Sequence, residues 1–284
     1  MMQIPENPVP GPARNYIGYG RDIPKVVWPN EAALGELAYV IDPIYRDLSM
    51  ESVYEYGTRA GIWRLQRLFD QKKVPVTFFA AAVALERNPE VAAWLRDSAH
   101  EPCSHGWRWE EMWLLTREEE KAHMEAAIKS FQETCGKRPL GWYCRYGPSV
   151  HTRELVVEEG GFVYDADAYN DDLPYYVDVK GTRHLIVPYT LTYNDAAFVV
   201  PQGYGSPGDF YDLCKRGFDY LWDEGATHPR MMSIGLHPRL IGQAGRISAL
   251  ADFIDYAQAK GGVWFATRLE IANWWNDHHA EFRT

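Results

Sequence analysis

Short apolar runs alternate along the chain with segments in which apolar residues recur at helical spacing. The apolar runs predict buried strands, at 36–42, 74–80, 101–104, 139–143, 162–165, 185–188 and 231–234. The segments between them predict helices, at 57–72, 88–95, 116–134, 152–159, 209–224 and 248–259. Start signals support two of these helices, since Asn88 precedes Pro89 and Thr116 stands three residues before Glu119. Strands that alternate with helices predict parallel β/α units, closed as a barrel or left open.

The domain organisation follows from where this pattern begins. Residues 1–30 are rich in proline and glycine and show no period, so they predict an extended N-terminal arm. Residues 31–284 contain no repeat, low-complexity tract or linker. A chain of 284 residues suits one large α/β domain, and we predict a single β/α barrel domain over 31–284.

Composition and charge narrow the possible partners. The net charge of −10 argues against nucleic acid, since binding phosphates needs a basic surface. No apolar run approaches the roughly 20 residues that span a bilayer, and the N-terminus has no signal-peptide pattern, so we expect no membrane partner and a cytoplasmic location. The 4 cysteines have no CxxC spacing, which favours reduced thiols. A small-molecule substrate remains as the expected partner.

Several polar residues fall at or just past the ends of predicted strands. They are Asp42, His105, Arg145, Asp165 and His237. In a β/α barrel the chemistry gathers at the carboxyl ends of the strands, so these residues are expected to share one pocket. Histidine can exchange protons near neutral pH or bind a metal, and its neighbours decide which.

The order of motifs resembles a known family. The stretches concerned are 49–61, 104–109, 156–162, 170–175 and 235–240. They resemble the metal-independent allantoinases, a branch of the polysaccharide deacetylase superfamily, and the resemblance extends to bacterial cyclic imide hydrolases. It implies a single-domain, distorted β/α barrel of the polysaccharide deacetylase type that hydrolyses a carbon–nitrogen amide bond. It also implies a homo-oligomer, often a tetramer.

Two departures from the family pattern concern the region where substrate should bind. Typical members carry an early strand that ends in Asn-Tyr-Glu-Glu-Gly, and here the nearest substitute is the strand ending at Asp42. Where the family has Gly-Arg-Thr before a Ser-Pro-Asn, this chain has Cys-Arg-Tyr-Gly-Pro-Ser at 144–149. The resemblance therefore implies the reaction class and leaves the individual substrate open.

The metal requirement can be argued from spacing. Metal-dependent members of the superfamily pair an Asp with His-x-x-x-His, and here the second histidine position is Trp109, whose indole cannot coordinate a cation. This favours catalysis without a cofactor. The alternative is a single divalent ion such as zinc, held by Asp42, His105 and either Glu110 or Glu111.

Amide hydrolysis without a metal needs a base, an acid and donors for the oxyanion. We expect Asp42 or Glu111 to be the base and orienting carboxylate beside His105, His237 to be the acid, and Arg145 to stabilise the negative charge. The expected substrate-contacting residues are Trp107, Trp109, Asp171 and Asp172.

Each assignment has a structural alternative. Asp42 before Pro43 also suits the cap of a turn, and Arg145 a surface ion pair. The Asp171-Asp172 pair is typical of a solvated turn, and Trp107 and Trp109 of core or pocket wall.

The favoured function is hydrolysis of a small cyclic ureide or imide in a closed, aromatic-lined pocket. The second is removal of acetyl from an amino sugar or oligosaccharide, which needs an open groove and usually the metal triad. The third is a non-enzymatic binding or assembly protein that has lost the first catalytic motif.

Overall fold

The computed structural model describes residues 48–144 and 147–282. The predicted arm over 1–30, the predicted strand over 36–42 with Asp42, and Arg145 lie outside the described residues.

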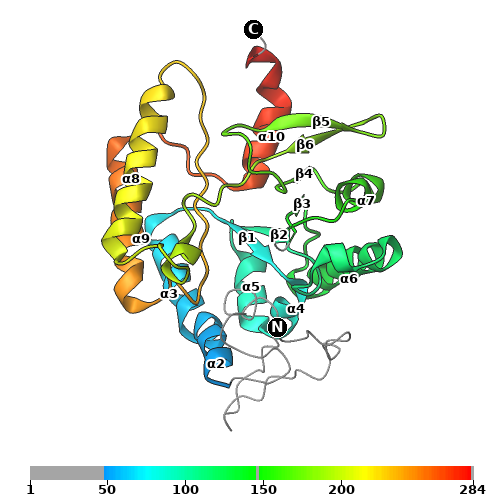
Figure 1. The fold of residues 1–284 in the computed structure, drawn as a ribbon, viewed down its shortest axis with the longest axis horizontal. Coiled ribbons are helices and arrows are strands. Elements are labelled where there is room, and N and C mark those ends of the chain that lie inside the picture. Colours follow the sequence, from blue (N-terminus) through cyan, green and yellow to red (C-terminus); the bar gives the residue numbers. More distant parts are fainter. Residues whose placement is uncertain (1–47, 145–146, 283–284) are drawn as a thin grey trace, which may run out of the picture.

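A six-stranded sheet forms the centre of the structure, in the order β1-β2-β3-β4-β6-β5 (Figure 1). Strands β1, β2, β3, β4 and β6 pair in parallel in that order, and β5 pairs antiparallel with β6. The prediction of an α/β fold with a mostly parallel sheet is confirmed. Among the described residues, the ladder ends at β1 and β5 and does not close into a ring. The strands are β1 Thr77–Ala80, β2 Glu101–Ser104, β3 Gly141–Trp142, β4 Tyr164–Asp165, β5 Tyr175–Val179 and β6 Thr182–Ile186.

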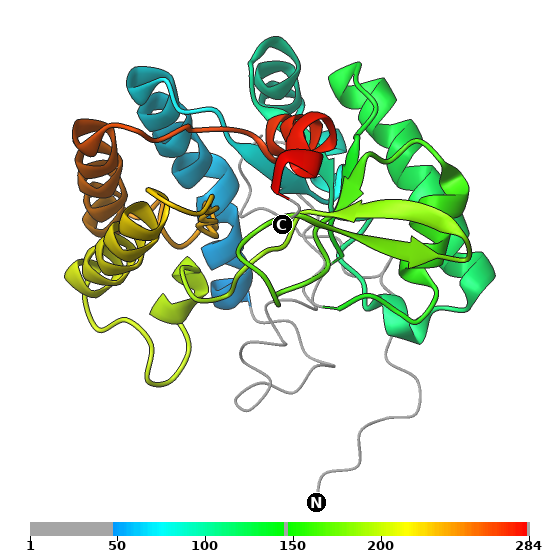
Figure 2. The same cartoon turned by 90° about the horizontal axis from the view of Figure 1, so that it is seen from above.

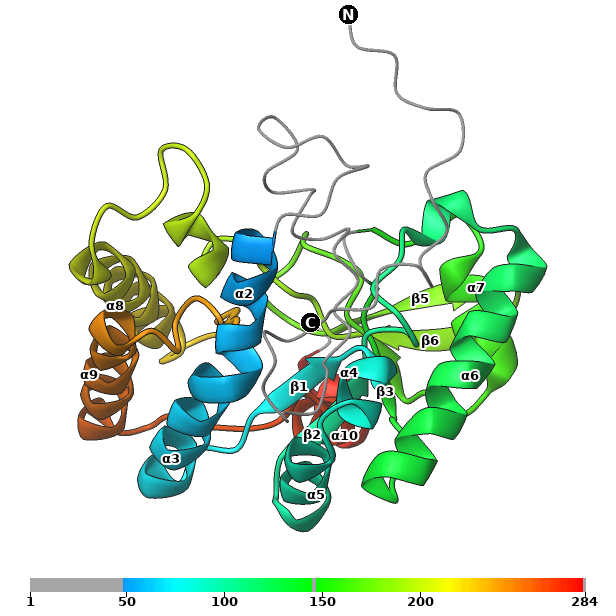
Figure 3. The ribbon, with the colours of Figure 1, turned by 90° about the horizontal axis from the view of Figure 1, so that it is seen from below.

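The helices connect these strands and lie outside the sheet. Figure 3 shows α9, α3, α5 and α6 as an arc around the strands, with α8 packed beside α9. The α-helices are α2 Leu48–Tyr56, α3 Ile62–Lys72, α4 Ala82–Glu86, α5 Pro89–Asp97, α6 Arg117–Cys135, α7 Thr152–Glu159, α8 Pro207–Glu224, α9 Ala244–Lys260 and α10 Arg268–His278. A π-helical turn, η2 Gly57–Gly61, joins α2 to α3, and short 3-10 turns are η3 Met112–Leu114, η4 Asp195–Phe198 and η5 His279–Phe282.

The predicted helix starts are confirmed by their caps. Asn88 accepts the backbone N–H of Val91 at the start of α5, with Pro89 in the first turn. Thr116 and Glu119 form the predicted reciprocal capping box of α6. These local interactions satisfy backbone donors that have no partner within the helix, so the sequence signal is strong at these positions.

Helix α10 lies across the end of the sheet at which β1 and β2 begin (Figure 2). The buried Glu101 accepts hydrogen bonds from the Leu269 backbone N–H, the Thr77 hydroxyl and the Tyr164 hydroxyl. Burial raises the pKa of Glu101. The residues that follow the carboxyl ends of the strands, including His105, therefore lie at the opposite end, which leaves that end for the candidate site.

Two parts of the strand prediction differ from the structure. Residues 231–234 carry no ladder, and pairing there is reduced to one parallel bridge between Asn194 and Gly235. The hairpin of β5 and β6 was not predicted. Its turn at Lys180 and Gly181 has positive φ at both residues, 51° and 84°, so the Gly was a usable hairpin signal.

The core is divided among several clusters of buried side chains. The largest joins α3, α8 and α9 through residues such as Phe69, Phe210 and Phe253. All four cysteines are buried free thiols, as their spacing predicted. In the parts of the chain that the structure describes, every helix is too short or too polar to cross a membrane.

Two glycines of the 49–61 motif allow η2 to pack directly on the loop that follows His237. A Cβ at Gly61 would lie 1.9 Å from the Pro238 carbonyl oxygen, and one at Gly57 would lie 3.0 Å from the Arg239 nitrogen. Because both neighbours are backbone atoms, they cannot rotate away. The motif thus has a packing reason, which is to hold the His237 loop against the first helical segment.

We predict that Gly61→Ala lowers the free energy of unfolding by about 1–3 kcal/mol, since the added methyl overpacks a backbone contact. Gly245→Ala is the matched control, because a Cβ there meets no atom within 4 Å. Alanine at this helical position should be neutral or stabilising, by up to about 1 kcal/mol. Urea unfolding of the two variants decides, and equal stabilities would contradict the packing argument.

Candidate active site

His105 directly follows β2, and its backbone N–H donates to the Ala80 carbonyl at 2.9 Å. The next residue, Gly106, has φ of +82°, and a Cβ there would lie 2.7 Å from the Nε2 atom of His123. His123 Nε2 accepts the backbone N–H groups of Trp107 and Arg108, at 2.8 and 3.3 Å. The turn after His105 is therefore fixed by a buried neutral imidazole on α6.

The His105 ring is held by Tyr143 in two ways. Its Nδ1 lies 2.6 Å from the Tyr143 carbonyl oxygen, and the two rings stack at 5.1 Å with an interplanar angle of 10°. A carbonyl oxygen can only accept, so Nδ1 carries the proton and Nε2 carries the lone pair in the neutral ring. The arrangement can supply a proton acceptor at Nε2.

His237 is held by a buried carboxylate. Its Nδ1 lies 2.6 Å from Asp195 Oδ1, while Asp195 Oδ2 accepts the backbone N–H groups of His237 and Ile241 at 2.8 and 3.0 Å. Asp195 is 0% exposed, whereas 27% of the His237 side chain is exposed. A carboxylate in this position accepts a hydrogen bond from Nδ1 and orients the imidazole, an arrangement that can serve proton transfer.

The single bridge between Asn194 and Gly235 brings this pair together. The Asp195 N–H donates to the Gly235 carbonyl at 2.9 Å, and the Gly235 N–H donates to the Tyr193 carbonyl at 3.1 Å. A Cβ at Gly235 would lie 1.9 Å from the Tyr189 hydroxyl, so any larger residue there would have to displace the Tyr189 side chain. The bridge places a carboxylate beside a histidine 42 residues further along the chain.

Both histidines line one cavity of about 1340 Å³ among the described residues. Its wall near His105 is aromatic, formed by Phe79, Trp109, Tyr143, Tyr169 and Tyr189. The buried guanidinium of Arg268 lies over Phe79 and Tyr189 and donates to the Pro188 carbonyl and the Ser233 hydroxyl. Flat apolar walls with a few fixed polar groups are typical of sites for small ring compounds.

The other predicted site residues divide between the cavity and its surroundings. Trp109 lines the cavity, with its ring 6.2 Å from His105. Trp107 packs against the cluster of α4, α5 and α6 and donates to Glu86. Glu111 precedes η3 and is not among the residues that line the cavity.

Asp171 and Asp172 are exposed and likewise outside the cavity lining, and Asp171 accepts the Leu173 N–H at 3.0 Å in a turn. Asp42 and Arg145 lie outside the described residues. The structure thus brings together His105, His237 and Trp109 of the predicted set.

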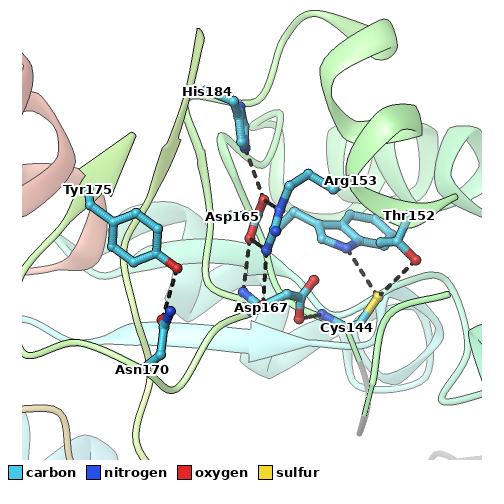
Figure 4. Close-up of polar contacts among 9 residues, drawn as sticks. Cys144, Thr152, Arg153, Asp165, Asp167, Asn170, Tyr175 and His184 are labelled. Carbon is cyan, nitrogen blue, oxygen red and sulfur yellow. Dashed lines mark hydrogen bonds and ion pairs between the residues drawn. The ribbon is translucent and has the colours of Figure 1, made fainter. Parts of the chain in front are cut away.

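Asp165 was expected at the shared pocket, and the structure places it in a buried ion pair instead. It is held by Arg153 at 2.9 Å and His184 at 3.1 Å (Figure 4). Burial opposes its ionisation, but the hydrogen bonds from His184 and Arg153 outweigh burial and lower the pKa of Asp165. Its charge is used inside the protein and does not face a substrate.

The metal-ligand set of the superfamily does not fit the described residues. Trp109 occupies the second histidine position, and among residues 48–144 and 147–282 three or more His, Cys, Asp or Glu side chains nowhere gather as a cation site. Of the side chains that commonly bind metals, the described cavity wall contains the imidazoles of His105 and His237, and the Nδ1 atom of each is hydrogen-bonded within the protein. We therefore derive no step through a metal.

Sequence reasoning missed Asp195 and the carbonyl of Tyr143. The signal for Asp195 was weak, because an Asn-Asp pair before a helical turn is ordinary capping chemistry. A backbone carbonyl carries no sequence signal at all. Both partners became visible only through long-range pairing.

We predict that His123 makes stability fall as the pH is lowered below neutral. Burial lowers the pKa of His123 to about 4, below its ordinary 6.5, so the unfolded chain binds the proton more readily. The contribution of His123 is therefore complete above pH 6.5 and is lost as pH falls toward 4, on the order of 3 kcal/mol in total.

The measurement is the difference in free energy of unfolding between pH 7 and pH 5, for wild type and for His123→Gln. Glutamine can still accept the two N–H groups but does not titrate. The variant should lose less stability than wild type over this interval, and an unchanged pH slope would refute the assignment.

Comparisons with known proteins assign the family. The pattern described as polysaccharide deacetylase matches residues 48–164. A Schizosaccharomyces pombe protein named as a polysaccharide deacetylase is 38% identical over 253 residues, which cover 82% of this chain and 78% of the relative.

Two crystal structures of similar proteins agree with this assignment. A Pseudomonas aeruginosa protein described as a polysaccharide deacetylase aligns with a TM-score of 0.80 and 48% identity, covering 83% of this chain and 79% of its own. The structure of Puue allantoinase aligns with a TM-score of 0.79 and 46% identity, covering 84% of this chain and 79% of its own. The chain belongs to the polysaccharide deacetylase family.

Proposed function

We propose that the protein hydrolyses a carbon–nitrogen amide bond in a small cyclic ureide or imide. The observation that carries the proposal is the pair of histidines in one aromatic-walled cavity, each bound through Nδ1 to a buried acceptor. The similarity to Puue allantoinase, at 46% identity over most of both chains, supports a cyclic amide as the substrate.

The proposed reaction assigns one proton step to each histidine. A water molecule beside His105 gives its proton toward Nε2 as its oxygen attacks the amide carbon. The carbon–nitrogen bond then breaks, and the leaving nitrogen takes a proton from His237, whose positive form Asp195 stabilises. The ring opens to a carboxylic acid, which loses its proton to solvent, and an amide or ureido group. His105 then releases its proton and His237 takes one up through solvent, so the atoms balance without a cofactor.

The second candidate is removal of an acetyl group from an amino sugar. It is supported by the names of the Schizosaccharomyces pombe and Pseudomonas aeruginosa relatives. The residue at position 109 favours the cyclic amide, because an indole replaces the ligand that a metal-dependent deacetylase uses there. The two functions differ in their need for a divalent ion, so one experiment separates them.

That experiment assays purified, chelator-treated protein against allantoin, hydantoin, dihydrouracil, succinimide and N-acetylglucosamine oligomers. We expect ring opening of at least one cyclic amide, with no gain when zinc is added back. Activity confined to the sugars and restored by zinc would establish the second candidate, and no turnover of any substrate would overturn both.

With a substrate identified, His237→Ala should lower kcat by roughly 10²–10⁴-fold, the usual contribution of a positioned proton donor. Asp195→Asn should lower kcat on the order of 10²-fold or more, because the amide can donate to Nδ1 and reverse the tautomer. His228→Ala, at an exposed histidine outside the cavity, is the control and should keep wild-type kcat. Near-normal turnover by His237→Ala would contradict the assigned acid.

A further inference from the structure

One peptide group separates His105 from a buried carboxyl group that the proposed reaction does not use. The Tyr143 carbonyl accepts the Nδ1 proton of His105 at 2.6 Å. The N–H of the same peptide group, on Cys144, donates to Asp167 Oδ1 at 2.8 Å. The imidazole, the peptide group and the carboxyl group thus form one continuous chain of hydrogen bonds.

The backbone of Asp167 is held rigidly by the ion-pair network shown in Figure 4. Its N–H donates to Asp165 Oδ1 at 3.0 Å, and its carbonyl accepts from Arg153 at 3.0 Å. Asp165 is in turn bound by Arg153 and by His184. The position of Asp167 Oδ1, and with it the Tyr143–Cys144 peptide group, is therefore determined from outside the cavity.

We propose that Asp167 is a positioning residue for His105, and that it fixes the Nδ1–H tautomer of this histidine through the Tyr143–Cys144 peptide group. A peptide group whose N–H is bound is held in one orientation, and its carbonyl becomes a better acceptor because successive hydrogen bonds polarise one another. The Nδ1 proton of His105 then has one fixed acceptor. The lone pair stays on Nε2, where the proposed reaction needs it.

The electrostatic state of Asp167 fits this role. Burial, with the nearby charge of Asp165, holds the pKa of Asp167 well above its ordinary value, which favours the neutral form of the carboxyl group. Its Oδ2 atom is buried without a hydrogen-bond partner among the described residues, which a neutral acid tolerates better than an anion. What the peptide group requires is the acceptor oxygen rather than a charge, and asparagine offers the same oxygen.

This difference defines a matched pair of variants. Asp167→Asn keeps an acceptor for the Cys144 N–H, whereas Asp167→Leu has nearly the same shape and no acceptor. The ¹⁵N chemical shifts of His105, recorded at pH 8 on selectively labelled protein, report the tautomer directly. We expect one Nδ1–H tautomer in wild type and in Asp167→Asn, and a mixture of tautomers in Asp167→Leu.

Kinetics give a second readout, which rests on the proposed function. Asp167→Leu should lower kcat roughly tenfold or more, as expected for a misplaced catalytic group, with KM changed by less than about threefold. Asp167→Asn should stay within about threefold of wild-type kcat. Asp178→Asn, at an exposed carboxylate near the end of β5, is the control for the loss of an acid and should change neither readout.

The outcomes separate this inference from the proposed function. Should Asp167→Leu not fold, Asp167→Ala removes the acceptor without added bulk, and the same spectrum decides. An unchanged tautomer in a folded variant that lacks the acceptor overturns the inference, whatever the activity. A tautomer change in a protein that hydrolyses no cyclic amide supports the inference and rejects the proposed function.

Discussion

The hydrogen bonds at Nδ1 of His105 and His237 fix how these two rings are oriented in the cavity wall. Each cavity histidine donates a hydrogen bond from Nδ1 to an acceptor in the protein interior. The acceptor is the Tyr143 carbonyl for His105 and the Asp195 carboxylate for His237. A free imidazole would exchange between two tautomers and several ring positions, so only part of the population would face a substrate correctly. Fixing Nδ1 removes that loss before any substrate binds.

The two acceptors differ in charge, and this difference separates the roles of the histidines. Asp195 is a carboxylate that accepts three hydrogen bonds, one from His237 Nδ1 and two from the backbone N–H groups of His237 and Ile241. The Tyr143 carbonyl is uncharged, and the N–H of the same peptide group donates to Asp167, whose pKa is raised by burial. An uncharged acceptor stabilises a positive ring less than a carboxylate does, and for this reason the proposed reaction gives His105 the role of proton acceptor. The proposed reaction needs both a proton acceptor and a proton donor, and the different partners of the two histidines suit them to these two roles.

The same principle operates one layer further out. Asp165 and Asp167 lie two residues apart in the interior and cannot both ionise at low cost, so the pKa of Asp165 is lowered while that of Asp167 is raised. Arg153 and His184 decide which, because both bind Asp165. The buried charge of Asp165 thus holds the backbone of Asp167 in place. The Asp167 side chain then binds the peptide group beside His105.

Sequence reasoning reached the features that local chemistry determines. The caps of α5 and α6 and the strand before His105 could be predicted, because each depends on neighbours within a few residues. The partners of the histidines could not, since Asp195 is brought to His237 by one bridge between distant segments and the acceptor of His105 is a backbone carbonyl. Spacing along the chain carries no information about such contacts.

The failure at Asp165 has the opposite cause. A carboxylate at the carboxyl end of a parallel strand is a sound candidate for chemistry, and His105, which lines the cavity, lies at that end of the sheet. What decided its role was a basic residue on α7 and a histidine on β6, both close enough to neutralise it inside the protein. A strand-end carboxylate is available to a substrate only when no basic side chain of the protein pairs with it. Here Arg153 pairs with Asp165 inside the protein. Asp165 in turn holds the backbone of Asp167, which binds the peptide group next to His105.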